Sequence, residues 1–288
     1  SRFSNEPLTD FSKSNNRDAM KEALRQVKRT FGRAYPLVIG KNEIRSEKVT
    51  RSINPAHPSE TIGLVSAATA AQAEKAIAEA RDVAETWRLT SAEERADYLF
   101  SVAKLLRNRK YELAALQVYE VGKNWAEADA DVAEAIDFLE YYGREMIRLG
   151  APRPLGEYPG EENVMLYQPK GVGVVISPWN FPLAIAAGMV SAAIVTGNCV
   201  VFKPSSLSPV LGWELFDAFR RAGLPPNVLQ FLPGSGDEIG DYLVSHSDVD
   251  FIAFTGSRDV GLRIMQLASR MGTHQRNVKK VIAEMGGK

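Results

Sequence analysis

The chain has 288 residues, of which 45% are hydrophobic and 24% charged, and this length allows one large or two ordinary domains. The charges of its 35 basic and 35 acidic side chains cancel, which argues against a nucleic acid or an anionic membrane as a binding partner. A single cysteine excludes an intrachain disulfide and fits a reducing compartment, and since the sequence has no membrane-length apolar run and no apolar secretion signal, we expect a cytoplasmic protein.

Residues 1–150 are rich in Ala, Glu, Lys and Arg with helical periodicity, so we expect them to form an N-terminal helical part of the fold. Thr69 is suited to cap one helix, and Ser91 with Glu94 forms a capping box for the next. The helices expected here are 16–32, 69–87, one that starts at 91, 111–121 and 124–149. Only two short strands, 36–39 and 47–53, are expected between the first two helices.

Residues 151–171 are rich in Pro and Gly and on composition alone indicate a linker, although 163–168 could form a strand. After them, short β-branched runs alternate with helices. The expected strands are 172–176, 199–202, 228–232, 251–254 and 278–282, and the expected helices are 182–195, 209–222, 238–245 and 257–271. This rhythm predicts an α/β fold with a doubly wound, mostly parallel Rossmann-like sheet, in which ligands bind beyond the carboxyl ends of the strands.

Two of the predicted strand ends carry polar groups that could serve a ligand. The first loop, residues 177–182, holds Asn180 between two prolines, where its amide could donate to a developing oxyanion. The alternative is an aromatic turn in which Asn180 bonds to local backbone. Lys203 ends the second strand and could bind ribose hydroxyls or offset phosphate charge, or it could be a solvated side chain at an edge turn.

Two glycine-rich loops follow the next strands. Residues 234–240 read Gly-x-Gly-x-x-x-Gly, one residue longer than the usual dinucleotide fingerprint. Ser257 is a natural N-cap, and the free N–H groups behind it could hold a pyrophosphate, or the serine could simply cap a helix. Together the two loops favour nucleotide binding.

Glu284 and Cys199 are the remaining candidates for chemistry. A carboxylate after a buried strand can act as a general base when burial tunes its pKa, but a lone Glu is more often a salt-bridged surface residue. Cys199 lies inside a predicted buried strand, and no histidine is placed by the sequence to activate it. We therefore interpret Cys199 as packing and not as a nucleophile.

These loops and the Glu-x-Gly-Gly-Lys motif at 284–288 together resemble the aldehyde dehydrogenase superfamily, with every motif in family order. The resemblance covers essentially the whole chain. Segments 5–11, 35–39 and 127–142 are similar to the subfamily that oxidises L-glutamate γ-semialdehyde (1-pyrroline-5-carboxylate) in proline catabolism. The resemblance implies an oxidoreductase that uses NAD, with NADP also accepted, and forms a homo-oligomer. It also implies functional coupling to proline dehydrogenase, fused or separate.

The resemblance also implies roles for single residues. Asn180 would donate to the oxyanion, Glu284 would activate water, and Glu134 and Phe181 would lie on the substrate side. The cofactor-binding residues that it implies are Ile176, Ser177, Pro178, Trp179, Lys203, Ser205, Ser206, Gly236, Gly240, Phe254, Thr255, Gly256 and Ser257. Ser206 stands where many NAD-specific relatives have Glu, which is why we expect NADP to be accepted. No metal is implied.

The domain organisation implied is an N-terminal helical part (1–150), an oligomerisation β-flap (151–171) and a Rossmann-like NAD-binding domain (172–288). The family's nucleophilic Cys would lie beyond Lys288, so we expect the catalytic domain to be absent and this chain to bind cofactor without turnover. One alternative is a non-catalytic nucleotide-binding or assembly module. Another α/β dehydrogenase or reductase is disfavoured, because no Tyr-x-x-x-Lys follows the glycine-rich loops.

Overall fold

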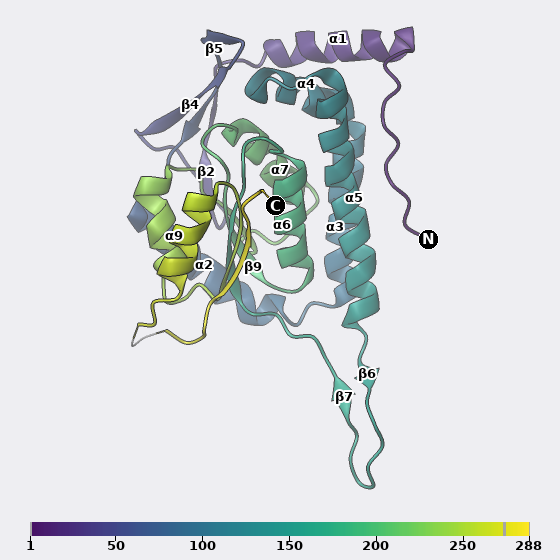
Figure 1. Cartoon of the computed structure of the whole chain (residues 1–288), viewed down its shortest axis with the longest axis vertical. Helices are drawn as coiled ribbons and strands as arrows, with labels where there is room; N and C mark the ends of the chain where they lie inside the picture. Colours follow the sequence, from purple (N-terminus) through teal and green to yellow (C-terminus); the bar gives the residue numbers. More distant parts are fainter. Residues whose placement is uncertain (1, 273–274, 288) are drawn as a thin grey trace.

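A seven-stranded sheet lies at the centre of the computed structural model, which describes residues 2–272 and 275–287 (Figure 1). Its strand order is β12-β11-β8-β9-β10-β2-β3. The parallel strands are β8 (Val172–Ile176), β9 (Cys199–Lys203), β10 (Leu229–Phe231), β11 (Phe251–Thr255) and β12 (Lys280–Glu284). The strand order reverses between β8 and β11, which makes that point the expected ligand site of a doubly wound sheet.

Helices cover both faces of this sheet, as the doubly wound prediction requires (Figure 1). On one face, α6 (Ala184–Val195) and α7 (Pro209–Arg221) pack between the sheet and an outer layer of helices. The outer layer consists of α3 (Ala92–Asn108), α4 (Lys110–Val121) and α5 (Trp125–Gly150), with α1 (Ser14–Lys28) against α4. On the opposite face lie α2 (Ala70–Trp87), α8 (Asp241–Ser245) and α9 (Arg258–Ala268). Among the described helices, none combines the length and the apolar character needed to cross a bilayer.

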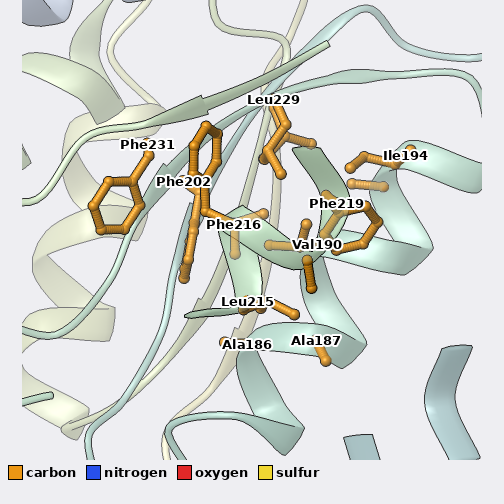
Figure 2. Packing of buried hydrophobic residues seen from close by; sticks show 14 of the residues in the cluster. Ala186, Ala187, Val190, Ile194, Phe202, Leu215, Phe216, Phe219, Leu229 and Phe231 are labelled. Atoms are coloured by element: carbon orange, nitrogen blue, oxygen red, sulfur yellow. The ribbon is translucent and has the colours of Figure 1, made fainter. Parts of the chain in front are cut away.

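Buried hydrophobic side chains of α6, α7 and the sheet pack together in the core (Figure 2). Helix α6 is apolar on every side, as expected of a helix buried between two layers. Phe202 of β9 and Phe231 of β10 are fully buried with ring centroids 6.1 Å apart, and Phe216 of α7 stacks on Phe231 at 5.4 Å. This aromatic packing fixes α7 and therefore the loop that leads into it from β9.

Residues 33–66 contain more strands than predicted. There β1 (Arg33–Tyr35), β4 (Val49–Asn54) and β5 (His57–Ser66) make a separate three-stranded sheet. In addition, β2 (Leu37–Ile39) and β3 (Asn42–Ile44) extend the central sheet in antiparallel fashion. The strands expected at 36–39 and 47–53 are confirmed as β2 and β4, whereas β1, β3 and β5 were not expected. Strand β5 escaped prediction because its first five residues are polar or Pro and give no hydrophobic alternation.

Most other predicted elements are confirmed to within a few residues, with two informative shifts. The last strand, β12, begins and ends two residues later than expected, so that it includes Glu284. The helix predicted at 238–245 begins with a π-helical turn, η1 (Gly236–Gly240), before α8. Such turns are rare and occur often at functional sites.

The Pro- and Gly-rich segment is a hairpin and not a plain linker. Strands β6 (Arg153–Pro154) and β7 (Val164–Met165) pair antiparallel, and the segment projects away from the body of the molecule (Figure 1). Tyr158 and Tyr167 are exposed on it. The strand expected at 163–168 is therefore present but shorter.

Glu120 of α4 anchors the N-terminal layer to the central sheet. Its fully buried carboxylate accepts hydrogen bonds from Ser52 Oγ (2.6 Å) and from the Val210 and Leu211 N–H groups (2.9 and 2.8 Å) at the start of α7. Burial raises the pKa of Glu120 to about 7, against the effect of these three hydrogen bonds. The start of α7, and with it the end of the β9 loop, is thereby held in place.

Close packing between β8 and β11 gives a test of the sheet. A Cβ added at Gly173 would lie 2.0 Å from Phe251 Cζ, so Gly173→Ala should lower the free energy of unfolding by about 1–3 kcal/mol through overpacking. Urea denaturation measures this. Gly156→Ala, with no heavy atom near the added Cβ, is the control and should change little. Equal stability of the two variants would contradict the strand pairing described here.

Candidate functional site

A cavity of about 970 Å³ lies at the carboxyl ends of β8, β9, β11 and β12, and we refer to it as the strand-end cavity. Its volume is within the usual range of ligand sites, roughly 300–1,000 Å³. All the predicted catalytic and cofactor residues line it, as does Phe181. The predicted residues that line the cavity are Ile176, Ser177, Pro178, Trp179, Asn180, Phe181, Lys203, Ser205, Ser206, Gly236, Gly240, Phe254, Thr255, Gly256, Ser257 and Glu284.

The sequence left open whether the Asn180 amide bonds to local backbone or donates to a ligand, and its contacts allow both. Its Oδ1 accepts the Phe181 N–H at 3.2 Å, which is the local backbone bond of the plain alternative. This bond orients the amide and leaves its NH₂ group without a partner among the described residues. The NH₂ group is therefore available to donate to a ligand oxygen in the cavity.

Lys123 and Asp131 position this loop, and the sequence analysis missed both. Asp131 of α5 is fully buried and accepts the Ala184 N–H at 2.7 Å, at the start of α6. Lys123 bonds to the other Asp131 oxygen at 3.0 Å and lies 4.1 Å from the Phe181 ring centroid. The contacts that reach the loop, Asp131 with Ala184 and Lys123 with Phe181, join residues more than fifty positions apart, so no local pattern could have revealed them.

Lys203 is the most unusual side chain of the cavity. It is only 6% exposed, and its ammonium group has no hydrogen bond or ion pair within the described part of the chain. Burial lowers its pKa from 10.5 to about 8. Buried cations are normally paired, so a free one that lines a cavity indicates a site for an electron-rich ligand group.

Ser205 and Ser206, which follow Lys203, differ in whether their hydroxyl groups already form a hydrogen bond. Ser205 Oγ accepts the Leu207 N–H at 3.2 Å and so shapes the turn. Ser206 is exposed and its hydroxyl has no partner in the described structure. Of the two, Ser206 is the side chain with a hydroxyl left over for a ligand.

The glycine-rich loop places open backbone beside the cavity. No heavy atom lies within 4 Å of a Cβ built at Gly236 or Gly240, so a ligand could approach the backbone there. Gly234 is different, because its Cβ would meet Ile239 Cδ1 at 2.8 Å, and its role is packing. Ser235 accepts the Glu238 N–H at 3.2 Å, and Lys48 pairs with Glu238, which together fix the loop.

The start of α9 faces the same cavity. Ser257 caps the helix by accepting the Val260 N–H, as predicted. The N–H groups of Arg258 and Asp259 form no hydrogen bond among the described residues, and the helix dipole adds partial positive charge there. This helix end can therefore accept an anionic group such as a pyrophosphate.

Glu284 lines the cavity, and its side chain is exposed. The prediction placed it after a buried strand, whereas it is the exposed last residue of β12, an edge strand that is only half-buried. Its Oε1 accepts the Gly286 N–H at 2.9 Å. Lys288, the last residue of the predicted motif, lies outside the described residues.

Two further candidate residues, Glu134 and Cys199, do not line the strand-end cavity. Glu134, predicted on the substrate side, lies exposed on α5 and does not line the cavity, and burial followed by the nearby Asp131 charge raises its pKa. Cys199 is fully buried in β9, where desolvation raises its pKa to about 12. A protonated, enclosed thiol is not a nucleophile, which agrees with the interpretation of Cys199 as packing.

The arrangement as a whole can hold a ligand that carries both an anionic group and hydroxyls. Lys203 and Ser206 offer polar contacts at the end of β9, and the start of α9 offers free N–H groups. Trp179 and Phe181, both about half exposed, add apolar and aromatic surface. Asp241 and Arg263, which bond to each other at the cavity wall, were not predicted, since each is an ordinary charged helix residue in the sequence.

Comparison with known proteins gives consistent matches. The profile of the aldehyde dehydrogenase family matches residues 42–288. The 1-pyrroline-5-carboxylate dehydrogenase of Geobacillus kaustophilus is 51% identical over 286 residues, which are 99% of this chain and 56% of that protein. The chain thus spans about half the length of the curated relatives it matches.

Solved structures give the same result. A 1-pyrroline-5-carboxylate dehydrogenase from Thermus with bound NAD is 47% identical with a TM-score of 0.98, covering 100% of this chain and 56% of that one. Proline utilization A from Bdellovibrio bacteriovorus is 44% identical with a TM-score of 0.97, covering 99% of this chain and 30% of that one.

Because the Lys203 ammonium group is buried and has no partner among the described residues, we predict that the stability of the protein depends on pH. Its folded pKa, about 8, is below the 10.5 of an exposed lysine, so the unfolded chain binds more protons between these values. The free energy of unfolding should therefore rise as the pH increases through that window. The neutral Lys203→Met should be about 2–4 kcal/mol more stable than the wild type at pH 7, and the difference should shrink towards pH 10.

Urea denaturation of both proteins between pH 7 and 10 measures this effect. Lys75→Met, which removes an exposed helix lysine, is the control and should keep a constant difference from the wild type. A Lys203→Met variant less stable than the wild type at pH 7 would show that the Lys203 ammonium group has a stabilising partner.

Proposed function

The chain belongs to the aldehyde dehydrogenase family, and from that membership we propose that it is the cofactor-binding part of an NAD-dependent enzyme. The reaction we propose for the whole protein is oxidation of L-glutamate γ-semialdehyde, in equilibrium with 1-pyrroline-5-carboxylate, to L-glutamate. The identity of about 50% to 1-pyrroline-5-carboxylate dehydrogenases supports this substrate. Proline catabolism is the corresponding metabolic role.

The observation that carries the proposal is the buried ammonium group of Lys203, which has no partner among the described residues and lines the same cavity as the open start of α9. A dinucleotide offers ribose hydroxyls and a pyrophosphate, which match these two features in kind. In this proposal Lys203, Ser205 and Ser206 bind the adenosine ribose. Residues of β8, β11 and the glycine-rich loop shape the rest of the site, namely Ile176, Ser177, Pro178, Trp179, Gly236, Gly240, Phe254, Thr255, Gly256 and Ser257.

The remaining cavity residues serve the reacting end of the site. NAD, when bound, supplies the hydride acceptor for aldehyde oxidation. The free NH₂ group of Asn180 donates to the substrate oxygen as negative charge develops on it. Glu284 removes a proton from the attacking water, and Phe181 lines the aldehyde side. Glu134 lies outside the cavity, and we assign it to the substrate side only as a neighbour of Asp131 and Lys123.

The one cysteine of the sequence is not suited to form the covalent intermediate of this reaction. Cys199 is buried and protonated. We therefore propose that these 288 residues bind the dinucleotide without turnover, and that residues 172–288 supply most of the site. The protein would act in the cytoplasm, as its one cysteine suggests.

The projecting hairpin supplies the proposed interaction with further copies of the chain. Its exposed aromatic and aliphatic residues suit an interface, and we propose that residues 151–171 join subunits of a homo-oligomer. Proline dehydrogenase is the proposed functional partner, since relatives include proline utilization A proteins.

Dinucleotide binding by the purified chain tests the proposal directly. Isothermal titration calorimetry should show one NAD site per chain, and Lys203→Met should weaken it by about 1.5–3 kcal/mol, or roughly 10–150-fold. Lys75→Met should bind NAD as the wild type does. Incubation with NAD and the semialdehyde should yield no NADH. Absence of NAD binding to the folded chain would contradict the proposal.

The serine at position 206 leads us to predict that the protein discriminates only weakly between NAD and NADP. The wild type should bind both NAD and NADP, with NAD the tighter, because no carboxylate repels the 2′-phosphate. Ser206→Glu should weaken NADP binding roughly tenfold or more through charge repulsion while NAD changes much less. Ser206→Gln, of the same size but neutral, separates charge from bulk. A wild type that binds NAD but not NADP would rule out this role for Ser206.

A further inference from the structure

A second cavity, of about 420 Å³, lies between α1, β1, α4 and α7, and we call it the α1/α7 cavity. It shares no lining residue with the strand-end cavity. Its volume suits a small ligand. None of the roles proposed above uses it.

Two aromatic side chains in this cavity carry unused hydrogen-bond donors. Tyr35 and Trp213 are only 4% and 5% exposed, with ring centroids 5.9 Å apart. Buried Tyr and Trp normally find a partner, yet neither the Tyr35 hydroxyl nor the Trp213 indole N–H bonds to any described residue. Neither atom is sealed inside the protein either, so both open to the cavity that their side chains line.

The Tyr35 hydroxyl is held in its donor form. Burial, followed by the nearby charge of Glu214, raises its pKa to about 12. The phenol therefore keeps its proton at neutral pH. An indole N–H can only donate, so both groups require an acceptor.

The carboxylates that line the cavity are already engaged by arginines. Arg109 bonds to Glu112 and, at 2.7 Å, to Glu214. Arg220 bonds to Asp217 at 2.6 Å. A cationic ligand would therefore find no free carboxylate in this cavity.

Two further arginines of the cavity wall have no such partner. Arg33 and Arg221 are exposed and form no ion pair within the described residues. The Arg33 guanidinium lies over the Tyr35 ring, 5.4 Å from its centroid. The lining as a whole has four guanidinium groups against three carboxylates.

We propose that the α1/α7 cavity binds a small oxyanion, carried by a carboxylate or a phosphate group. The Tyr35 hydroxyl and the Trp213 N–H would donate to its oxygens, and Arg33 and Arg221 would pair with its charge. Guanidinium groups match the geometry of both oxyanions, and hydrogen bonds to a charged acceptor are about twice as strong as neutral ones.

Calorimetric titration of the chain with inorganic phosphate and, separately, with citrate tests this site. Chloride keeps the ionic strength constant, so that bulk screening does not mimic binding. We expect saturable binding of one or both anions at one site per chain. Phosphate alone would identify a phosphate ligand, citrate alone a carboxylate ligand, and both an unselective oxyanion site.

Variants locate the binding. The double variant Arg33→Gln and Arg221→Gln should weaken it about tenfold or more, and Tyr35→Phe should weaken it several-fold. Both arginines are exposed and unpaired, so the fold should persist, which thermal melting checks. Arg45→Gln removes an exposed arginine outside the cavity and should leave binding unchanged. Failure of both anions to saturate, or full binding by the folded double variant, would overturn the proposal.

Discussion

The parallel pairing of β8 with both β9 and β11 is the constraint on which the candidate site depends. Val174 of β8 lies in register with Val201 on one side and Ile252 on the other. Because all these strands run in one direction, their following loops must emerge at one edge of the sheet. Asn180 and Lys203, distant in sequence, therefore border one cavity. Loss of this register would separate them whatever their own chemistry.

In the strand-end cavity, the Lys203 ammonium group lowers the stability of the fold, because it is withdrawn from water without a hydrogen-bond partner in the described structure. Lys203 is desolvated without a partner, and the first N–H groups of α9 have no acceptor among the described residues. Folding alone would favour an apolar residue at position 203, so a lysine there agrees with the proposed role in binding. Glu120 and Asp131, which support the cavity from the surrounding helices, are by contrast hydrogen-bonded to the starts of α7 and α6. Rigid support around an unsatisfied site is what a pre-organised ligand site requires.

The sequence predicted the parts of the fold that have a local signal. Helix starts with a capping serine or threonine and β-branched strands between helices appear where expected, as at Ser91 and Val172–Ile176. Strand β5 begins with polar residues and was missed for that reason. The exposure of Glu284 could not be predicted, because burial of β12 depends on which strands flank it. The bond from Ala184 to Asp131 is a tertiary contact and has no signature in either segment.

The grouping of the candidate residues around one cavity was predicted more completely than the fold around them. Loops that follow neighbouring parallel strands lie at the same edge of the sheet, so the assignment of the strands was enough to group the residues at their ends. Among the residues predicted to serve the site, only Glu134, which lies on a helix, falls outside the cavity.

The most direct measurement is a crystal structure of the chain soaked with NAD. We predict density with the adenosine ribose at Lys203 and the pyrophosphate at the start of α9. An empty strand-end cavity at saturating NAD, or a dinucleotide bound elsewhere, would contradict the account.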